Sequence, residues 1–244
     1  MGEDLLEFSA LKSYIRSFVA SDMGLSAMDK LHPLDSWDEV RGRWALLDEM
    51  MSLVVSGEDA GFSAVPDIRE LLDIREGAIL EGKDIVMVAG VITDIARVKR
   101  SMEKAGSALA SLAASIDPLE ELPFEINSTL LPTGEISDSA SPVLRRLRKQ
   151  ARTLRAAILE KLSGIMDGLK KQSMVMEDLI TIRNERYVIP LRHDYSSHIK
   201  GITHDYSRSN KTAYVEPLAV VDENNTLNQI RSDIKEEELG ILRD

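Results

Sequence analysis

A change of pattern between two helical runs is the strongest constraint on the fold of this chain. From Leu144 to Leu169, apolar residues recur at steps of three and four, a spacing typical of a helix with one narrow buried face. The same spacing resumes at Leu218 in an acidic run. The stretch from Thr181 to Pro217 between them has short apolar runs bounded by turn-forming residues. These runs predict short strands at 187–189, 198–202 and 213–215. We therefore expect two long antiparallel helices with a small sheet or set of hairpins at their tip.

The residues before this region predict a helical body, so the expected fold class is mainly α. We place the boundary between residues 1–140, the body, and residues 141–244, the helical arm with its insertion at about 181–217. Ser141 is a suitable N-cap and Pro142 suits the first position of the first arm helix. The chain ends at Asp244 in the middle of a helical pattern, so we expect it to continue into a further domain.

Helical spacing recurs within the body. Apolar residues from Leu5 and Leu6 onward predict an amphipathic first helix. A second helix follows from about Asp35, and we place its Trp37 and Trp44 in the core. The stretch 82–115 favours a helix, with a strand around residues 86–91 as the alternative. The body carries no pattern typical of a catalytic site.

Composition excludes several classes of site. The chain has no cysteine, which excludes disulfides and cysteine-ligated zinc or iron–sulfur centres. It has no apolar run of roughly 18 residues and no basic–apolar leader at its start, so we expect no membrane partner and a cytoplasmic location.

Charge is distributed unevenly along the chain. The formal net charge is −11, but residues 141–216 contain 15 Lys+Arg and 8 Asp+Glu, a local charge of +7 against −18 for the rest. An acidic protein with one basic region binds polyanions through that region and repels them elsewhere.

The insertion contains the residues that we predict to contact nucleic acid. Guanidinium, ammonium, hydroxyl and amide groups contact phosphates without reading bases. The predicted contact residues are Arg183, Asn184, Arg186, Arg192, Lys200, Ser207, Arg208, Ser209, Asn210 and Lys211. The alternative is a solvated loop whose charges bind nothing.

The start of the first arm helix is denser still in cations. Positive charge near a helix N-terminus opposes the helix dipole, which indicates another reason for its presence. Either a polyanion or the acidic run Glu236, Glu237 and Glu238 of the returning helix accounts for it. The residues concerned are Arg145, Arg146, Arg148, Lys149, Arg152 and Arg155.

Two catalytic or metal-binding interpretations fit poorly. His193, His198 and His204, with Asp194 and Asp205, have spacings of five and six that match no helix or strand ligand geometry, so we expect no metal. A Ser–His–Asp triad here would be built from neighbours in sequence, which rarely converge. In addition, no strand–turn–helix elbow surrounds the serine. We expect no catalytic residues.

Four stretches, 6–24, 134–150, 181–217 and 220–242, resemble the N-terminal part of the MutS-II branch of the MutS family. Their order and spacing match along essentially the whole chain. The resemblance implies the lever and clamp region: a helical body plus a long antiparallel helical arm carrying a small β-rich clamp at its tip that closes on DNA. The branch generally lacks the mismatch-reading domain, and this chain begins directly with the body.

The resemblance also implies partners for a longer protein. The family carries an ABC-type ATPase, with ATP and magnesium, and usually a small nuclease domain. No GxxxxGK[ST] phosphate loop occurs in this sequence, so both are expected beyond Asp244. Where the family has a Ser-Ser-Gly turn, this chain has Ser209-Asn210, and Asn also tolerates a positive φ.

Two functions remain open. The first is phosphate-dominated binding of branched or duplex DNA, within a homodimer that suppresses recombination. The second is a helical adaptor that pairs with another protein or with the ribosome, as in the rescue of collided ribosomes.

Overall fold

The computed structural model describes residues 7–57, 65–75 and 77–243. The predictions for Leu5, Leu6 and the continuation at Asp244 lie outside these residues. The chain divides into two compact units, Met1–Ser137 and Asp138–Asp244, each with its own core. Mostly helical structure agrees with the expected fold class. In the part of the chain that is described, no helix has the length and apolar character needed to cross a membrane.

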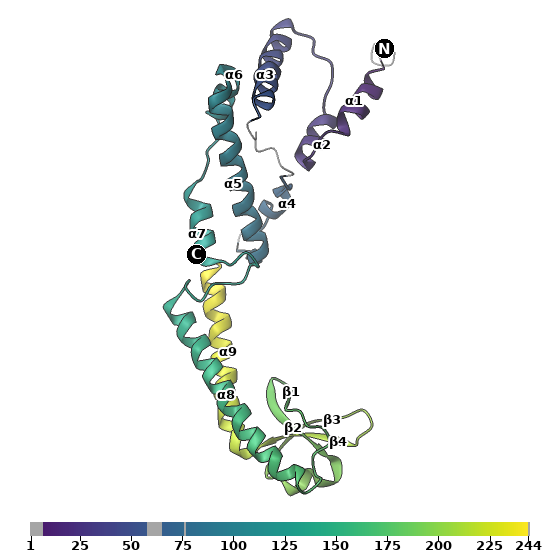
Figure 1. Cartoon of the computed structure of the whole chain (residues 1–244), viewed down its shortest axis with the longest axis vertical. Coiled ribbons are helices and arrows are strands. Elements are labelled where there is room, and N and C mark those ends of the chain that lie inside the picture. Colours follow the sequence, from purple (N-terminus) through teal and green to yellow (C-terminus); the bar gives the residue numbers. More distant parts are fainter. Residues whose placement is uncertain (1–6, 58–64, 76, 244) are drawn as a thin grey trace. The chain divides into compact units, whose positions relative to one another are not determined.

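The first unit is helical (Figure 1). Its two longest helices are α3 and α5, and the short α6 follows α5 after a break at the extended Gly106. The helices are α1 (Phe8–Arg16), α2 (Asp22–Asp29), α3 (Trp37–Val55), α4 (Arg69–Leu72), α5 (Gly82–Ala105), α6 (Ser107–Ala113) and α7 (Glu121–Thr129). The strand alternative around residues 86–91 is not realised, because these residues lie within α5.

The core of the first unit lies where α3, α5 and α6 meet. Met102, Leu109 and Ala113 are buried there, with Leu46 and Met50 packed against them. The Glu49 carboxylate of α3 accepts hydrogen bonds from the backbone N–H groups of Ala108 and Leu109, at 3.0 and 2.7 Å. A negative group at a helix N-terminus satisfies free donors and suits the helix dipole, so Glu49 fixes α6 to α3.

The placement of Trp37 and Trp44 in the core is wrong. They are 76% and 67% exposed. The face of α3 that is buried instead carries Leu46, Met50 and Leu53, which lies half a helical turn away from the tryptophans. Helical spacing identified the helix but could not tell which of its two apolar stripes faces the core.

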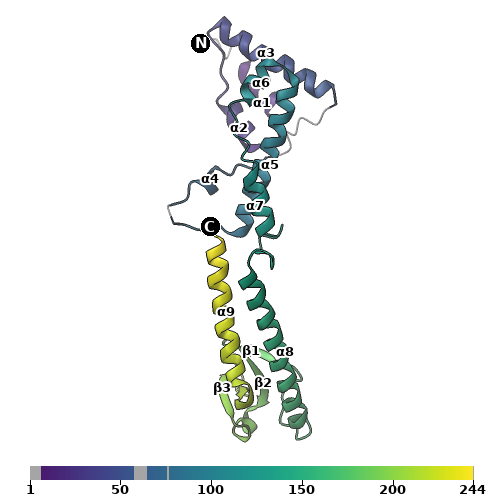
Figure 2. The same cartoon turned by 90° about the vertical axis from the view of Figure 1, so that its left-hand side faces the viewer.

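The second unit combines two helices with one antiparallel sheet. Figures 1 and 2 show α8 and α9 side by side, with the sheet against the end where α8 finishes and α9 begins. The strands occur in the spatial order β1-β2-β4-β3. The elements are α8 (Pro142–Lys170), β1 (Thr181–Arg183), β2 (Arg186–Arg192), β3 (Gly201–Tyr206), β4 (Thr212–Pro217) and α9 (Val221–Ile241), with short 3-10 turns η2 (His193–His198) and η3 (Leu218–Val220).

The expected long arm with a clamp at its tip is wrong. The sheet is not held out beyond the helices but packs on them, and α8, α9 and the sheet share one core. Ile158 and Leu162, from the middle of α8, lie in that core with Ile189 of β2, Val215 of β4 and Leu227 of α9. The physical reason is that β2 and β4 have one fully apolar face, which must be covered, and the apolar seam of α8 covers it.

Candidate nucleic-acid interface

The sheet has two chemically different faces. Ile189, Leu191, Ala213 and Val215 face the helices, because side chains alternate along a strand. The opposite face carries polar and charged groups. His204 follows Thr203 and points to the charged face, where it contacts Glu216. A β-bulge between Thr203 and Asp205 interrupts the alternation in β3, so Asp205 pairs with Tyr214 and lies on the charged face as well.

Glu216 is the centre of the charged face. Its side chain is 0% exposed. Arg186 Nη1 lies 3.2 Å from Glu216 Oε1, His204 Nε2 lies 2.5 Å from Oε2, and Asn224 Nδ2 donates to Oε1 at 2.8 Å. A buried carboxylate is stable only when paired and hydrogen-bonded in this way. Arg186, predicted to contact nucleic acid, is therefore already committed to an internal ion pair.

Asn224 ties the sheet to α9 at the same point. It is fully buried, and its side chain accepts from the backbone N–H of Tyr187 and donates to the Tyr187 carbonyl, both at 3.2 Å. The side-chain amide thus satisfies the β2 backbone beside the end of β4.

Arg183 is also held within the sheet. Its guanidinium lies 4.0 Å from the centre of the Tyr214 ring, and Nε lies 3.4 Å from Asp205 Oδ2. Nη1 donates to the carbonyl of Ile182 at 2.9 Å. A cation over an aromatic face beside a carboxylate has its charge largely satisfied. Arg183 therefore braces β1 against β4 and β3.

Asn184 forms the turn between β1 and β2. Asn184 and Glu185 have φ values of 49° and 63°, and Arg183 pairs directly with Arg186. Two consecutive positive φ angles in a two-residue loop are the signature of a type I′ hairpin. The Asn184 amide also donates to the carbonyl of His204 at 3.2 Å, so this residue has a structural role.

The other predicted contact residues gather at the opposite end of β2 and β4. Arg192 pairs with Thr212 across the ladder, and the backbone N–H of His193 donates to the carbonyl of Lys211 at 2.9 Å. Arg192, Arg208, Ser209, Asn210 and Lys211 are exposed. We call these five residues and Ser207 the loop-end surface. None of its cations forms an ion pair with a residue that the structure describes.

A pocket of about 740 Å³ opens beside the loop-end surface. Arg192, Asn210 and Lys211 line it together with His193 and Ser173. The sequence predicted the first three; it did not single out Ser173, which follows α8 and reaches the pocket only through the fold. Asp194 also lines the pocket and offsets part of its positive charge.

The loop from Ser207 to Lys211 is shaped by its polar residues. Asn210 has a φ of 54°, so the prediction that it replaces glycine at a positive-φ position is confirmed. Ser207 Oγ accepts from the Thr212 backbone N–H at 3.1 Å. Ser207 is therefore partly occupied in closing the loop. Lys200 lies apart, just before β3 at the other end of the sheet, where its carbonyl accepts from Leu218.

The basic start of α8 is only partly paired with acidic residues. Arg148 lies 2.7 Å from Asp138 and 2.8 Å from Glu238, and Arg152 lies 3.5 Å from Asp138. The hydrogen bond from Arg148 lowers the pKa of the Asp138 carboxyl below its ordinary value. Pairing with the returning helix thus accounts for Arg148 but not for the remaining exposed cations.

The histidines do not converge on a common point. His204 contacts Glu216, His193 lies 5.3 Å from the Tyr206 ring, and His198 lies 5.4 Å from the Tyr195 ring. Among the described residues, no group of three or more His, Asp or Glu side chains is placed to hold a metal ion.

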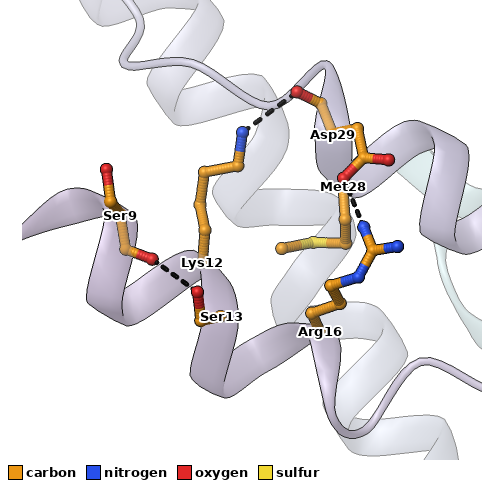
Figure 3. Close-up of a pocket in the computed structure, with 6 residues that line it drawn as sticks. All are labelled: Ser9, Lys12, Ser13, Arg16, Met28 and Asp29. Atoms are coloured by element: carbon orange, nitrogen blue, oxygen red, sulfur yellow. Dashed lines mark hydrogen bonds and ion pairs between the residues drawn. The ribbon is translucent and has the colours of Figure 1, made fainter.

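A smaller pocket lies between α1 and α2 in the first unit (Figure 3). Lys12 Nζ donates to the carbonyls of Asp29 and Leu31, both at 3.0 Å, and Arg16 pairs with the Asp29 carboxylate. Its cations are engaged in holding the two helices together, so this pocket offers little to a ligand.

Comparisons with known proteins agree with the sequence resemblance. No protein-family model matches the chain. It is 32% identical over 245 residues to the endonuclease MutS2 of Bacillus velezensis and, over the same length, to the putative endonuclease MutS2 of Bacillus subtilis. It is 34% identical over 247 residues to the endonuclease MutS2 of Geobacillus thermodenitrificans. Each match covers 98% of this chain, which spans about a third of the length of these curated relatives. The similarity supports membership of the MutS family.

Proposed function

We propose that this chain is a nucleic-acid-contacting part, without a catalytic role of its own, of a MutS-type protein. The observation that carries the proposal is the loop-end surface, where Arg192, Arg208 and Lys211 are exposed together beside hydroxyl and amide groups. Its position in a chain similar to proteins named MutS2 supports the same conclusion.

The expected mode of binding is phosphate contact without sequence readout. Arg and Lys neutralise phosphates, and Ser209 and Asn210 offer neutral hydrogen bonds to the same oxygens. We propose branched or recombination-intermediate DNA as the substrate, with suppression of recombination as the role. We further propose that the longer protein works as a homodimer and an ATPase, with ATP and magnesium bound outside this chain, and that it is also an endonuclease.

The test replaces the three exposed cations together, as Arg192→Gln, Arg208→Gln and Lys211→Gln. Binding to a four-way junction and to linear duplex DNA is measured across a salt series by fluorescence anisotropy. If these residues contact three phosphates, the slope of log K against log salt falls by about 2.7 and Kd rises at least about tenfold. An unchanged slope contradicts the proposal.

A control variant separates specific loss from the general effect of charge. It removes three exposed cations of the first unit, as Lys30→Gln, Arg43→Gln and Lys104→Gln, and so has the same net charge. The control is expected to keep the slope of the unmodified protein.

One observation favours a second function as an adaptor. Trp37, Trp44 and Met51 form an exposed apolar stripe along α3, at a seven-residue spacing that suits one partner helix. Such a protein would bind a partner without salt-sensitive affinity for DNA. A ribosomal RNA fragment belongs in the same anisotropy series, because tighter binding to it than to DNA indicates the ribosome.

A further inference from the structure

The first half of α8 carries an unusually dense set of cations. Six of the eleven residues from 145 to 155 are Lys or Arg, and residues 142–159 contain no Asp or Glu. We call these six residues the α8 basic stripe: Arg145, Arg146, Arg148, Lys149, Arg152 and Arg155.

The stripe lies away from the core. At 100° per residue, the six cations occupy one half of the helix circumference, and the buried Leu144, Leu147 and Ile158 occupy the other. Arg145, Arg146, Lys149, Arg152 and Arg155 are exposed. Apart from Arg148, which pairs with Glu238 of α9, the cationic face is therefore not required for packing of the second unit.

This arrangement costs helix stability. Arg145 and Lys149, like Arg148 and Arg152, are like charges at a spacing of i,i+4, and such pairs repel. Arg145 and Arg146 also lie at the first turn of the helix, where the dipole disfavours positive charge. The stripe therefore does not serve the stability of the helix itself.

Internal ion pairs satisfy only part of the stripe. Asp138 and Glu238 pair with Arg148 and Arg152. Arg146, Lys149 and Arg155 form no ion pair within the described residues 7–57, 65–75 and 77–243.

We propose that the α8 basic stripe is a second contact surface for a nucleic-acid backbone, separate from the loop-end surface. Residues 145 to 155 span about 15 Å of helix axis, long enough to meet several phosphates of one duplex. The exposed residues between and beside these cations, Gln150, Thr153 and Ala156, are small or polar. A protein partner would call for an apolar centre, which this face lacks, so a polyanion is the better fit.

The inference rests on the proposed function, since both require nucleic-acid binding, but it concerns a different surface. Its test is the variant Arg146→Gln, Lys149→Gln and Arg155→Gln in the full chain. Gln keeps a high helix propensity, and none of the three side chains holds an internal ion pair. Circular dichroism at 222 nm verifies that the helix is intact.

We expect a 30-base-pair duplex to bind this variant at least about fivefold more weakly, with a salt slope lower by about 2 to 3. The isocharged control Lys30→Gln, Arg43→Gln and Lys104→Gln is expected to bind as the unmodified chain does. A salt slope equal to that of the control overturns the inference.

Two comparisons keep this outcome distinct from failure of the proposed function. If the loop-end variant weakens binding and the α8 variant does not, the proposed function stands and the inference fails. If the α8 variant alone weakens binding, the stripe is the contact and the loop-end proposal fails. Polyglutamate serves as a second probe that represents an acidic protein. If the α8 variant weakens polyglutamate binding as much as duplex binding, the stripe is a surface for acidic proteins, and the inference is overturned.

Discussion

At the scale of single residues, the charged face of the sheet shows that similar cations have different tasks. Arg186 and Arg208 both belong to the basic insertion, yet Arg186 pairs with the fully buried Glu216 while Arg208 is exposed. Desolvation makes an uncompensated carboxylate costly, so Arg186 is needed for the fold. Arg208 forms no ion pair with a described residue and is available to a ligand.

The variant Arg186→Met is expected to lower the free energy of unfolding of the second unit by about 3 kcal/mol, because it leaves Glu216 buried without its cation. Hydrogen exchange followed by mass spectrometry on peptides covering 181–217 measures the loss. Arg208→Met is the matched control and is expected to change stability by less than about 0.5 kcal/mol.

Adding Glu216→Gln to Arg186→Met is expected to restore much of the lost protection, since a neutral amide is less costly to bury than a carboxylate. Equal protection in Arg186→Met and in the unmodified chain would show that Glu216 does not need this ion pair.

The sequence predicted that the insertion is basic but could not assign these roles. Charge is visible in a sequence, whereas the partner of a cation depends on which strands are neighbours. Arg183 finds Tyr214 and Asp205 only because β1, β4 and β3 belong to one sheet. The loop residue Asn210 was predictable, because its requirement is local to the backbone.

At the scale of elements, the β1–β2 hairpin depends on a strained turn. Glu185 has a φ of 63°, in the left-handed region that disfavours residues with a Cβ atom. Its side chain is exposed, and its carbonyl accepts from Arg231 Nη1 at 3.1 Å. Only the backbone of Glu185 makes a contact, so a residue that adopts a positive φ with less strain should stabilise the turn.

Glu185→Gly is expected to stabilise the second unit by about 1 kcal/mol, because glycine adopts this φ without strain. Glu185→Val, at the same exposed position, is expected to destabilise it, since a β-branched residue is disfavoured at positive φ. Thermal unfolding followed by circular dichroism measures both. The turn assignment fails if Gly and Val have the same effect.

This turn also explains an element that the sequence did not predict. Tyr187 to Ile189 and Ala213 to Val215 were expected as strands and lie in β2 and β4. Thr181 to Arg183 was not expected as a strand, because the Asn-Glu turn lacks the glycine that is typical of a two-residue hairpin. His198 was expected in a strand, but the 3-10 turn η2 continues to it and β3 begins at Gly201.

At the scale of the whole molecule, the two units have separate cores. In the second, β2 and β4 pack on α8 and α9 around Ile158, and in the first, Leu109 packs between helices. The arm prediction failed here, because helical spacing gives the apolar seam of α8 but not the element that covers it. The seam serves α9 and the sheet together, which makes the sheet part of the folded unit.

Separate cores predict separate responses to core mutations. Ile158 is fully buried and Leu109 is 2% exposed, so each truncation to alanine is expected to cost its own unit about 2–5 kcal/mol. Ile158→Ala should speed hydrogen exchange in β2, β4 and α9 while leaving α5 as protected as before. Leu109→Ala should speed exchange in α5 while leaving β2, β4 and α9 as protected as before. Because sites that share no partner act additively, the double variant should show the sum of the two patterns. If Ile158→Ala removes protection from α5 as well, the two units unfold as one cooperative body, and the stability of the nucleic-acid surfaces then depends on the helices of the first unit.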